Sequence, residues 1–146
     1  MSLAGVENLC VAPFSLSTTR NKIMAGLHAV AKRIAKAGIT GEIWLDGSFV
    51  TEKMDPSDSD IVVMVPAEFY DAGTEEQRSV IEWLISNENE PKRLHACDTY
   101  VHLRYRDESP EKDLWLPTLN RWQRIYGHSA KTAEPKGIVI LDLEGL

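Results

Sequence analysis

The chain has 146 residues, of which 43% are hydrophobic and 26% charged, and its formal net charge is −6. This size and balance fit one globular domain and leave no room for a second full domain. The negative charge argues against a generic nucleic-acid binder, whose affinity comes mostly from Lys and Arg neutralising phosphates. The longest apolar run, Ile61 to Val65, is far shorter than the roughly 20 residues that cross a bilayer, so we expect a cytoplasmic protein with no membrane association. Cys10 and Cys97 lack the spacing of a zinc site or disulfide framework and are expected to be reduced thiols.

In the N-terminal part of the chain, the spacing of apolar residues predicts an arm, a helix and a short strand. We expect residues 1–16 to form an extended arm ahead of a single domain that spans residues 17–146. Residues 19–37 are predicted to be an amphipathic helix, because apolar residues recur there at helical spacing before a glycine stop: Ile23, Leu27, Val30, Ile34 and then Gly38. Residues 42–46 are predicted to be a strand that directs Trp44 to one face and its two apolar neighbours to the other.

The middle of the chain predicts a central strand and a second helix. Every residue from Ile61 to Val65 is apolar, which is typical of a strand covered on both faces. Thr74 and Gln77 have the spacing of a capping box. The helix that follows is expected to bury a stripe of four residues: Val80, Ile81, Leu84 and Ile85.

The C-terminal part predicts a strand, a helix and a final strand. Residues 97–105 alternate, so that one face is polar: Asp98, Tyr100, His102 and Arg104. Ser109 and Pro110 are typical of a helix start, with a kink or restart at Pro117. Residues 137–143 are predicted to be the last strand.

The stretch from Gly47 to Val63 holds the residues expected to carry chemistry. A glycine directly after a strand lets the backbone approach a ligand, and a helical turn there offers free N–H groups, beside the Ser48 hydroxyl, for phosphate oxygens. Asp58 and Asp60 are two positions apart on an incoming strand, so their carboxylates project to the same side. Two carboxylates placed in this way repel unless a cation lies between them. Hard oxygen ligands of this kind suit Mg²⁺ or Mn²⁺.

This pattern resembles the nucleotidyltransferase superfamily that includes DNA polymerase β. The superfamily signature is a Gly-Ser after a strand, a loop of about a dozen residues, and a strand of the form Ser-Asp-x-Asp followed by hydrophobic residues. Residues 57–63, Ser-Asp-Ser-Asp-Ile-Val-Val, match that strand, and the preceding loop has the matching length. The chain is also similar to a group of small bacterial and phage-associated proteins that carry Leu-Asp-Gly-Ser-Phe-Val-Thr, here residues 45–51, and Pro-Lys-Gly-Ile-Val, here residues 135–139.

The resemblance, which spans roughly residues 20–143, implies an α/β (α+β) fold. We expect a nucleotidyltransferase-like mixed sheet of four or more strands, with helices on one face and the site on an open face. The resemblance implies that Asp58 and Asp60 hold Mg²⁺ or Mn²⁺, and that Asp98, on a neighbouring strand, shares the metal or acts as base. It further implies that Gly47 and Ser48 bind the β- and γ-phosphates of a nucleoside triphosphate (NTP). A nucleoside monophosphate would pass to a protein side chain, an RNA end or another nucleotide.

Other interpretations of the acidic stretch stay open. It could be a solvated turn, or a calcium loop, although the glycine that such a loop requires is absent and a strand starts at once. Asp46 fits either a further acidic group near the metal or a turn cap. At the scale of the protein, the rival is a non-enzymatic binding module or a subunit of a toxin–antitoxin or defence complex. The lack of a second helical domain to bind a base and acceptor favours that rival.

Five basic residues could reach a phosphate: Lys53, Lys92, Arg93, Arg104 and Lys136. Arg104 is favoured because it shares the face of Asp98, although it lies about 20 Å farther along the strand. Surface solvation is the alternative for each of them. The histidines have no metal-ligand spacing, and Trp115 and Trp122 have a helical spacing that indicates core or a partner surface.

Overall fold

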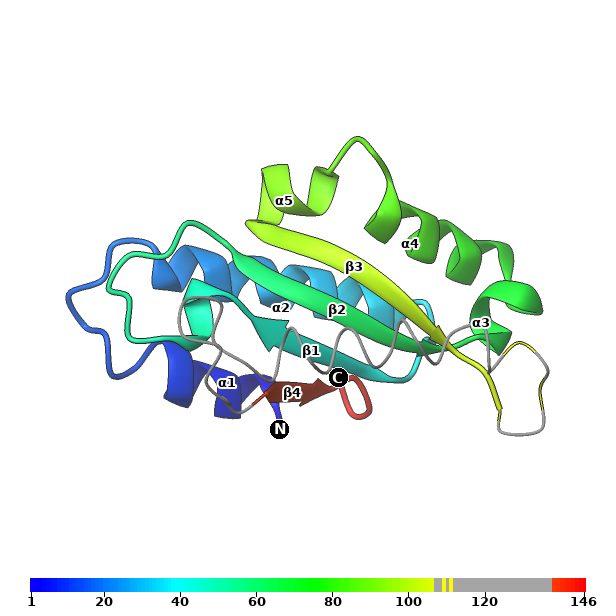
Figure 1. The fold of residues 1–146 in the computed structure, drawn as a ribbon, viewed down its shortest axis with the longest axis horizontal. Helices are drawn as coiled ribbons and strands as arrows, with labels where there is room; N and C mark the ends of the chain where they lie inside the picture. Colours follow the sequence, from blue (N-terminus) through cyan, green and yellow to red (C-terminus); the bar gives the residue numbers. More distant parts are fainter. Residues whose placement is uncertain (107–108, 110, 112–137) are drawn as a thin grey trace.

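The fold is built on a four-stranded mixed sheet (Figure 1). The computed structural model describes residues 1–106, 109, 111 and 138–146. The strand order is β3-β2-β1-β4. Strand β1 (Glu42–Asp46) lies antiparallel to β2 (Ser59–Pro66) and to β4 (Val139–Asp142), whereas β3 (Cys97–Arg104) lies parallel to β2. The predicted mixed α+β sheet is confirmed, and the all-apolar strand is an inner one.

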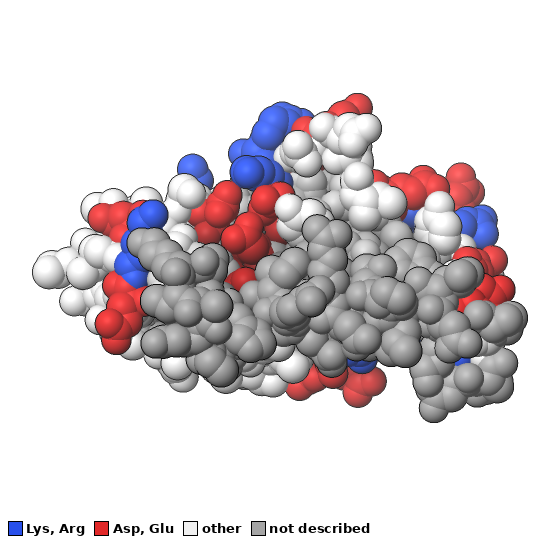
Figure 2. All heavy atoms as spheres, viewed as in Figure 1, with Lys and Arg blue, Asp and Glu red and all other residues white. Residues whose placement is uncertain are grey.

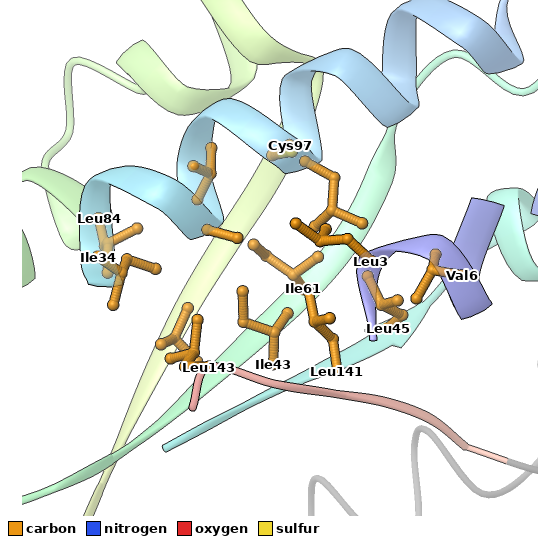
Figure 3. Close-up of a cluster of buried hydrophobic side chains, with 14 of the residues drawn as sticks. Leu3, Val6, Ile34, Ile43, Leu45, Ile61, Leu84, Cys97, Leu141 and Leu143 are labelled. Carbon is orange, nitrogen blue, oxygen red and sulfur yellow. The ribbon is translucent and has the colours of Figure 1, made fainter. Parts of the chain in front are cut away.

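The described helices pack on one face of this sheet. Helix α2 (Arg20–Lys36) is the longest of them and is joined by α1 (Leu3–Cys10), α4 (Glu75–Ile85), α5 (Glu90–His95) and the short α3 (Glu68–Asp71). Their apolar stripes meet the alternate residues of the strands that point the same way, including Ile43, Ile61 and Leu141 (Figure 3). The main hydrophobic core therefore lies between the helices and the sheet. No helix among the described residues is long and apolar enough to span a membrane.

The opposite face of the sheet carries a smaller apolar cluster. Trp44, Val62 and Met64 lie there and are at most 5% exposed, with Ile138 and Ile140 packed against them. Trp44 thus faces away from its two neighbours in β1, as predicted. The expectation of an open face was wrong for this middle part, because its large apolar side chains are buried. The face remains partly accessible at one end, where the aspartates lie.

The predicted extended arm was wrong, because residues 3–10 form α1. The Ser2 side chain accepts a hydrogen bond from the backbone N–H of Gly5 and caps the helix. Leu3, Val6 and Cys10 are then buried in the core, and Figure 3 shows the first two of them there. Their spacing is helical, so the arm is in fact part of the domain.

Smaller differences concern the ends of elements. The capping box of α4 forms as predicted, but Ile85 at its last position is 55% exposed. Helix α5 was not predicted, because its six residues are too few to show an apolar period. The final strand is shorter than residues 137–143. The helix predicted after Ser109, with Trp115 and Trp122, lies outside the described residues.

Candidate functional site

Three aspartates stand in one row across the sheet. The strand register pairs Asp46 with Asp60 and Asp60 with Asp98. Residues paired directly across neighbouring strands project to the same face, so the three side chains lie together on the face of Trp44. Asp58 precedes β2 and shares the side of Asp60. Asp46, Asp58, Asp60 and Asp98 are called the aspartate cluster below.

The fold dictates where this cluster forms. Strand β1 ends at Asp46, while β2 begins at Ser59 and β3 begins at Cys97. These three strand termini therefore lie side by side at the same end of the sheet. The predicted neighbourhood of Asp58, Asp60 and Asp98 is therefore present in the structure. Figure 2 shows acidic side chains gathered beside a group of basic ones at the end of the sheet where α5 lies.

The basic partner of the cluster is Lys92 of α5. Its Nζ lies 3.8 Å from Oδ2 of Asp58 and 3.7 Å from Oδ2 of Asp98. Those two carboxylate oxygens are consequently no farther apart than the sum of these distances, well within one screening length of about 10 Å at ordinary salt. Charge at either oxygen acts on the other.

The surroundings of Asp60 disfavour the negative charge of its carboxylate. Burial, and after it the charges of the three neighbouring carboxylates, raises the pKa of the Asp60 carboxyl from 3.8 to about 6. The positive charge of Lys92 acts in the opposite direction and only partly offsets the other effects. A negative charge at Asp60 is therefore costly without a further cation.

Gly47 allows the Asp60 carboxylate to lie against the backbone of the turn after β1. Its φ is +80°, a conformation that favours glycine, and a Cβ added there would stand 2.2 Å from Oδ2 of Asp60. A side chain at position 47 would thus both strain the backbone and collide with the carboxylate. Gly47 thus permits a close approach, here of the Asp60 carboxylate, while the approach of a ligand to this backbone stays a prediction.

A short 3₁₀ turn, η1 (Ser48–Val50), starts directly after Gly47. The backbone N–H of Val50 donates to the carbonyl of Gly47, and that of Thr51 donates to the carbonyl of Ser48. The first N–H groups of such a turn have no partner within the turn itself. The helical turn predicted at this position is present, and its N-terminus adjoins Asp60 through Gly47.

Arg20 holds the loop that carries this turn. Its buried guanidinium donates hydrogen bonds to the carbonyls of Phe49 and Thr51, each at 2.7 Å, and also to that of Lys53. A further bond to the carbonyl of Cys10 at 2.6 Å ties the loop to α1. The guanidinium also stacks on Phe14, 3.7 Å from the ring centre. One side chain of α2 thereby fixes the path of residues 49–53.

Asp55 fastens the next part of the same loop. Its Oδ1 accepts hydrogen bonds from the backbone N–H of Thr18 at 2.8 Å and from the Ser17 hydroxyl at 3.1 Å. The Thr18 bond holds the pKa of the Asp55 carboxyl below its usual value. Asp55 therefore acts as a structural tie between the loop and the residues just before α2, separate from the aspartate cluster.

The chain matches, over residues 1–142, the model of a family of unknown function, DUF6932. It belongs to this family. No curated protein and no solved structure matches it.

Among the basic residues of this DUF6932 protein, the structure favours Lys92 over Arg104. Arg104 lies at the far end of β3 from Asp98, opposite Pro66, and its Nη2 pairs with Oε2 of Glu42 at 3.3 Å. Arg104 therefore lies away from the aspartate cluster, as its position along the strand implied, and its role as a phosphate ligand stays a prediction. Lys136 lies outside the described residues.

The donor set of the cluster suits a hard cation, since carboxylate oxygens are the ligands that Mg²⁺ and Mn²⁺ prefer. However, within the described residues no three Asp, Glu, His or Cys side chains converge closely enough to form a metal site as they stand. Lys92 pairs with two of the carboxylates. The chemistry of the residues fits a divalent metal, while its binding would require side chains to move.

Two members of the site were left undecided by the sequence. Asp46 could equally have been a turn cap, and only its register opposite Asp60 places it in the cluster. Lys92 was one of five candidate cations, and it reaches the site because α5 turns back over the start of β3. The basic end of α5 was visible in the sequence, but its position was not.

Proposed function

We propose that the protein is a metal-dependent nucleotidyltransferase, which transfers a nucleoside monophosphate from an NTP to an acceptor and releases pyrophosphate. The observation that carries the proposal is the register of β2 and β3. This register brings Asp98 beside Asp60, on the same side of the sheet as Asp58. The turn at Gly47 lies at the same end of the sheet. This agrees with the arrangement that the sequence resemblance implies. We expect the activity in the cytoplasm.

The proposed roles follow from position and chemistry. Asp58 and Asp60 would hold Mg²⁺ or Mn²⁺, which when bound neutralises charge on the triphosphate and the leaving pyrophosphate. The carboxylate of Asp98 would share the metal or accept the proton of the attacking acceptor hydroxyl. The N–H groups at the start of η1, with Gly47 and the Ser48 hydroxyl, would donate hydrogen bonds to the β- and γ-phosphates.

A non-catalytic binding module is the second candidate. It is favoured by one observation, the pairing of Lys92 with Asp58 and Asp98, because this pairing relieves part of the repulsion without any metal. Such a module would keep the fold and the nucleotide site, and would act within a larger protein complex of the toxin–antitoxin or defence type.

Transfer of label from α-labelled NTP separates the two candidates. The protein, with Mg²⁺ or Mn²⁺, would be incubated with cell lysate and each of the four labelled NTPs, and pyrophosphate release would be followed in parallel. The matched variants are Asp60→Asn in the cluster and Asp71→Asn on the exposed end of α3, which make the same chemical change.

We expect label on a protein, RNA or nucleotide, lost in Asp60→Asn and kept in Asp71→Asn. NTP binding by calorimetry without pyrophosphate release in any mixture would support the binding module instead. Absence of NTP binding would contradict both.

A further inference from the structure

Lys92 is the only Lys or Arg that makes an ion pair with the aspartate cluster in the described part of the chain. Its ammonium lies almost equally far from the Asp58 and Asp98 oxygens, at 3.8 and 3.7 Å, and so pairs with two of the carboxylates that would hold the cation proposed above. The side chain of Lys92 is 50% exposed, whereas those of Asp58 and Asp98 are 23% and 29% exposed. The ammonium therefore reaches the carboxylates from the solvent side.

The backbone that carries Lys92 is held firmly. Asn89 and Ala96, on either side of α5, both adopt left-handed backbone conformations with φ near +50°. Gly26 of α2 packs so closely that an added Cβ would stand 1.7 Å from the carbonyl oxygen of His95. Helix α5 is thus packed directly against α2, so we expect the Lys92 ammonium to move through its own side chain.

The ion pairs of Lys92 are loose by comparison. A charge-assisted N–H···O bond typically spans about 2.7–2.9 Å, and both Lys92 distances are clearly longer. An ammonium on a flexible four-carbon stem can leave such a position at little cost. A counter-ion that a metal can displace needs a well-packed backbone and a loosely held charged group, and Lys92 has both.

We infer that Lys92 is an internal counter-ion, which occupies the place between Asp58 and Asp98 in the metal-free protein and competes there with the divalent cation. The inference rests on the metal site of the proposed function and adds a control on its affinity. An ammonium and a metal ion cannot both lie between the same two oxygens. Each must therefore weaken the binding of the other.

The competition predicts that removing the lysine tightens metal binding. The test measures Mn²⁺ affinity by the electron paramagnetic resonance signal of free Mn²⁺, without nucleotide, for the wild type, Lys92→Gln and Arg93→Gln. Arg93 is the matched control, because it stands on the same helix, is exposed, and donates through Nε to the carbonyl of Glu88, away from the cluster. Both variants change the net charge equally.

We expect Lys92→Gln to bind Mn²⁺ about three- to tenfold more tightly than the wild type, and Arg93→Gln to differ by less than about twofold. Lys92→Arg should keep the weak wild-type affinity. Thermal unfolding in EDTA verifies that all variants fold, and Lys92→Gln should have the lowest midpoint there, because its carboxylates have lost their partner.

Equal or weaker Mn²⁺ binding by Lys92→Gln, with the wild type binding measurably, would overturn the competition and leave the proposed transferase standing. Failure of every folded variant to bind Mn²⁺ would overturn the metal site and the competition together. Tighter binding by Lys92→Gln in a protein that transfers no nucleotide would uphold the competition and count against the transferase.

Discussion

Asp60 is a side chain of the site whose negative charge is opposed both by burial and by neighbouring carboxylates. It is partly buried, it has a carboxylate neighbour on each adjoining strand, and its pKa is raised from 3.8 to about 6. Because the folded-state pKa lies above the unfolded value, protonated Asp60 favours folding. This contribution is complete below about pH 4 and is lost as the pH rises through about 6.

The sign of that shift gives a pH prediction for the metal-free protein. Asp60→Asn removes the charge and keeps the shape, so its stability relative to the wild type should rise by on the order of 2 kcal/mol between pH 4.5 and 7.5. Urea unfolding of both proteins in EDTA across this range measures the difference. Curves that run parallel over the whole range would mean that Asp60 titrates in the folded protein as it does in the unfolded chain.

Gly47 permits a second prediction at the scale of one residue. Gly47→Ala should destabilise the protein by about 2–4 kcal/mol, because it combines a strained φ with a collision against the Asp60 carboxylate. Gly145→Ala is the control, since Gly145 also has a positive φ but has nothing within 4 Å of an added Cβ. Thermal unfolding of the two variants separates the collision from the backbone strain. A loss in Gly47→Ala no greater than in Gly145→Ala would show that the approach to Asp60 is not tight.

Among the elements, the loop between η1 and β2 depends on α2 for its shape. Arg20→Met leaves at least three buried or partly buried carbonyls without a donor, and should cost about 3–5 kcal/mol of unfolding free energy. Arg33→Met makes the same change farther along α2, where the guanidinium stacks on Trp83 at 3.9 Å, and should cost less than about 1 kcal/mol.

Urea unfolding checks the stabilities of these two variants, and amide hydrogen exchange localises the effect. Residues 48–53 should lose protection in Arg20→Met and keep it in Arg33→Met. Equal losses in both variants would remove the special role of Arg20 in holding the loop.

Several elements could be predicted from the sequence because a strong local signal agreed with the tertiary structure. The apolar run Ile61–Val65 of β2 is buried on both faces, and Thr74 with Gln77 forms the capping box of α4. Helix α1 was missed although Leu3, Val6 and Cys10 have helical spacing, because so short a helix is stable only when packed on a core. Helix α5 was missed because its six residues are too few to show an apolar period, and because Ala96, which ends it in a left-handed conformation, is not a residue that favours this conformation.

At the scale of the whole molecule, the parallel pairing of β2 and β3 assembles the aspartate cluster. The local pattern predicted that Asp58 and Asp60 project to the same side, and that prediction needed no tertiary information. The position of Asp98 needed the register between two strands about 40 residues apart in the chain, and only the resemblance to nucleotidyltransferases suggested it. The choice of Lys92 over Arg104 depended on the packing of α5, which no local pattern encodes.

Within the described residues, Lys92 of α5 makes ion pairs with two members of the aspartate cluster, and Figure 2 shows acidic side chains beside a group of basic ones there. In the proposed function, a nucleotide would be held by the η1 turn and by a metal that bridges it to the carboxylates. The metal is the component on which the proposed function depends most.

Paramagnetic broadening by Mn²⁺ in the nitrogen–proton spectrum of the labelled protein tests that component most directly, because it reports where a cation binds. We predict that substoichiometric Mn²⁺ broadens the amide signals around residues 46–48, 58–60 and 97–99 first, that excess Mg²⁺ reverses this, and that Asp60→Asn abolishes it. Broadening centred on the acidic residues of α4, or no localised broadening at millimolar Mn²⁺, would contradict a metal-dependent site at the aspartate cluster.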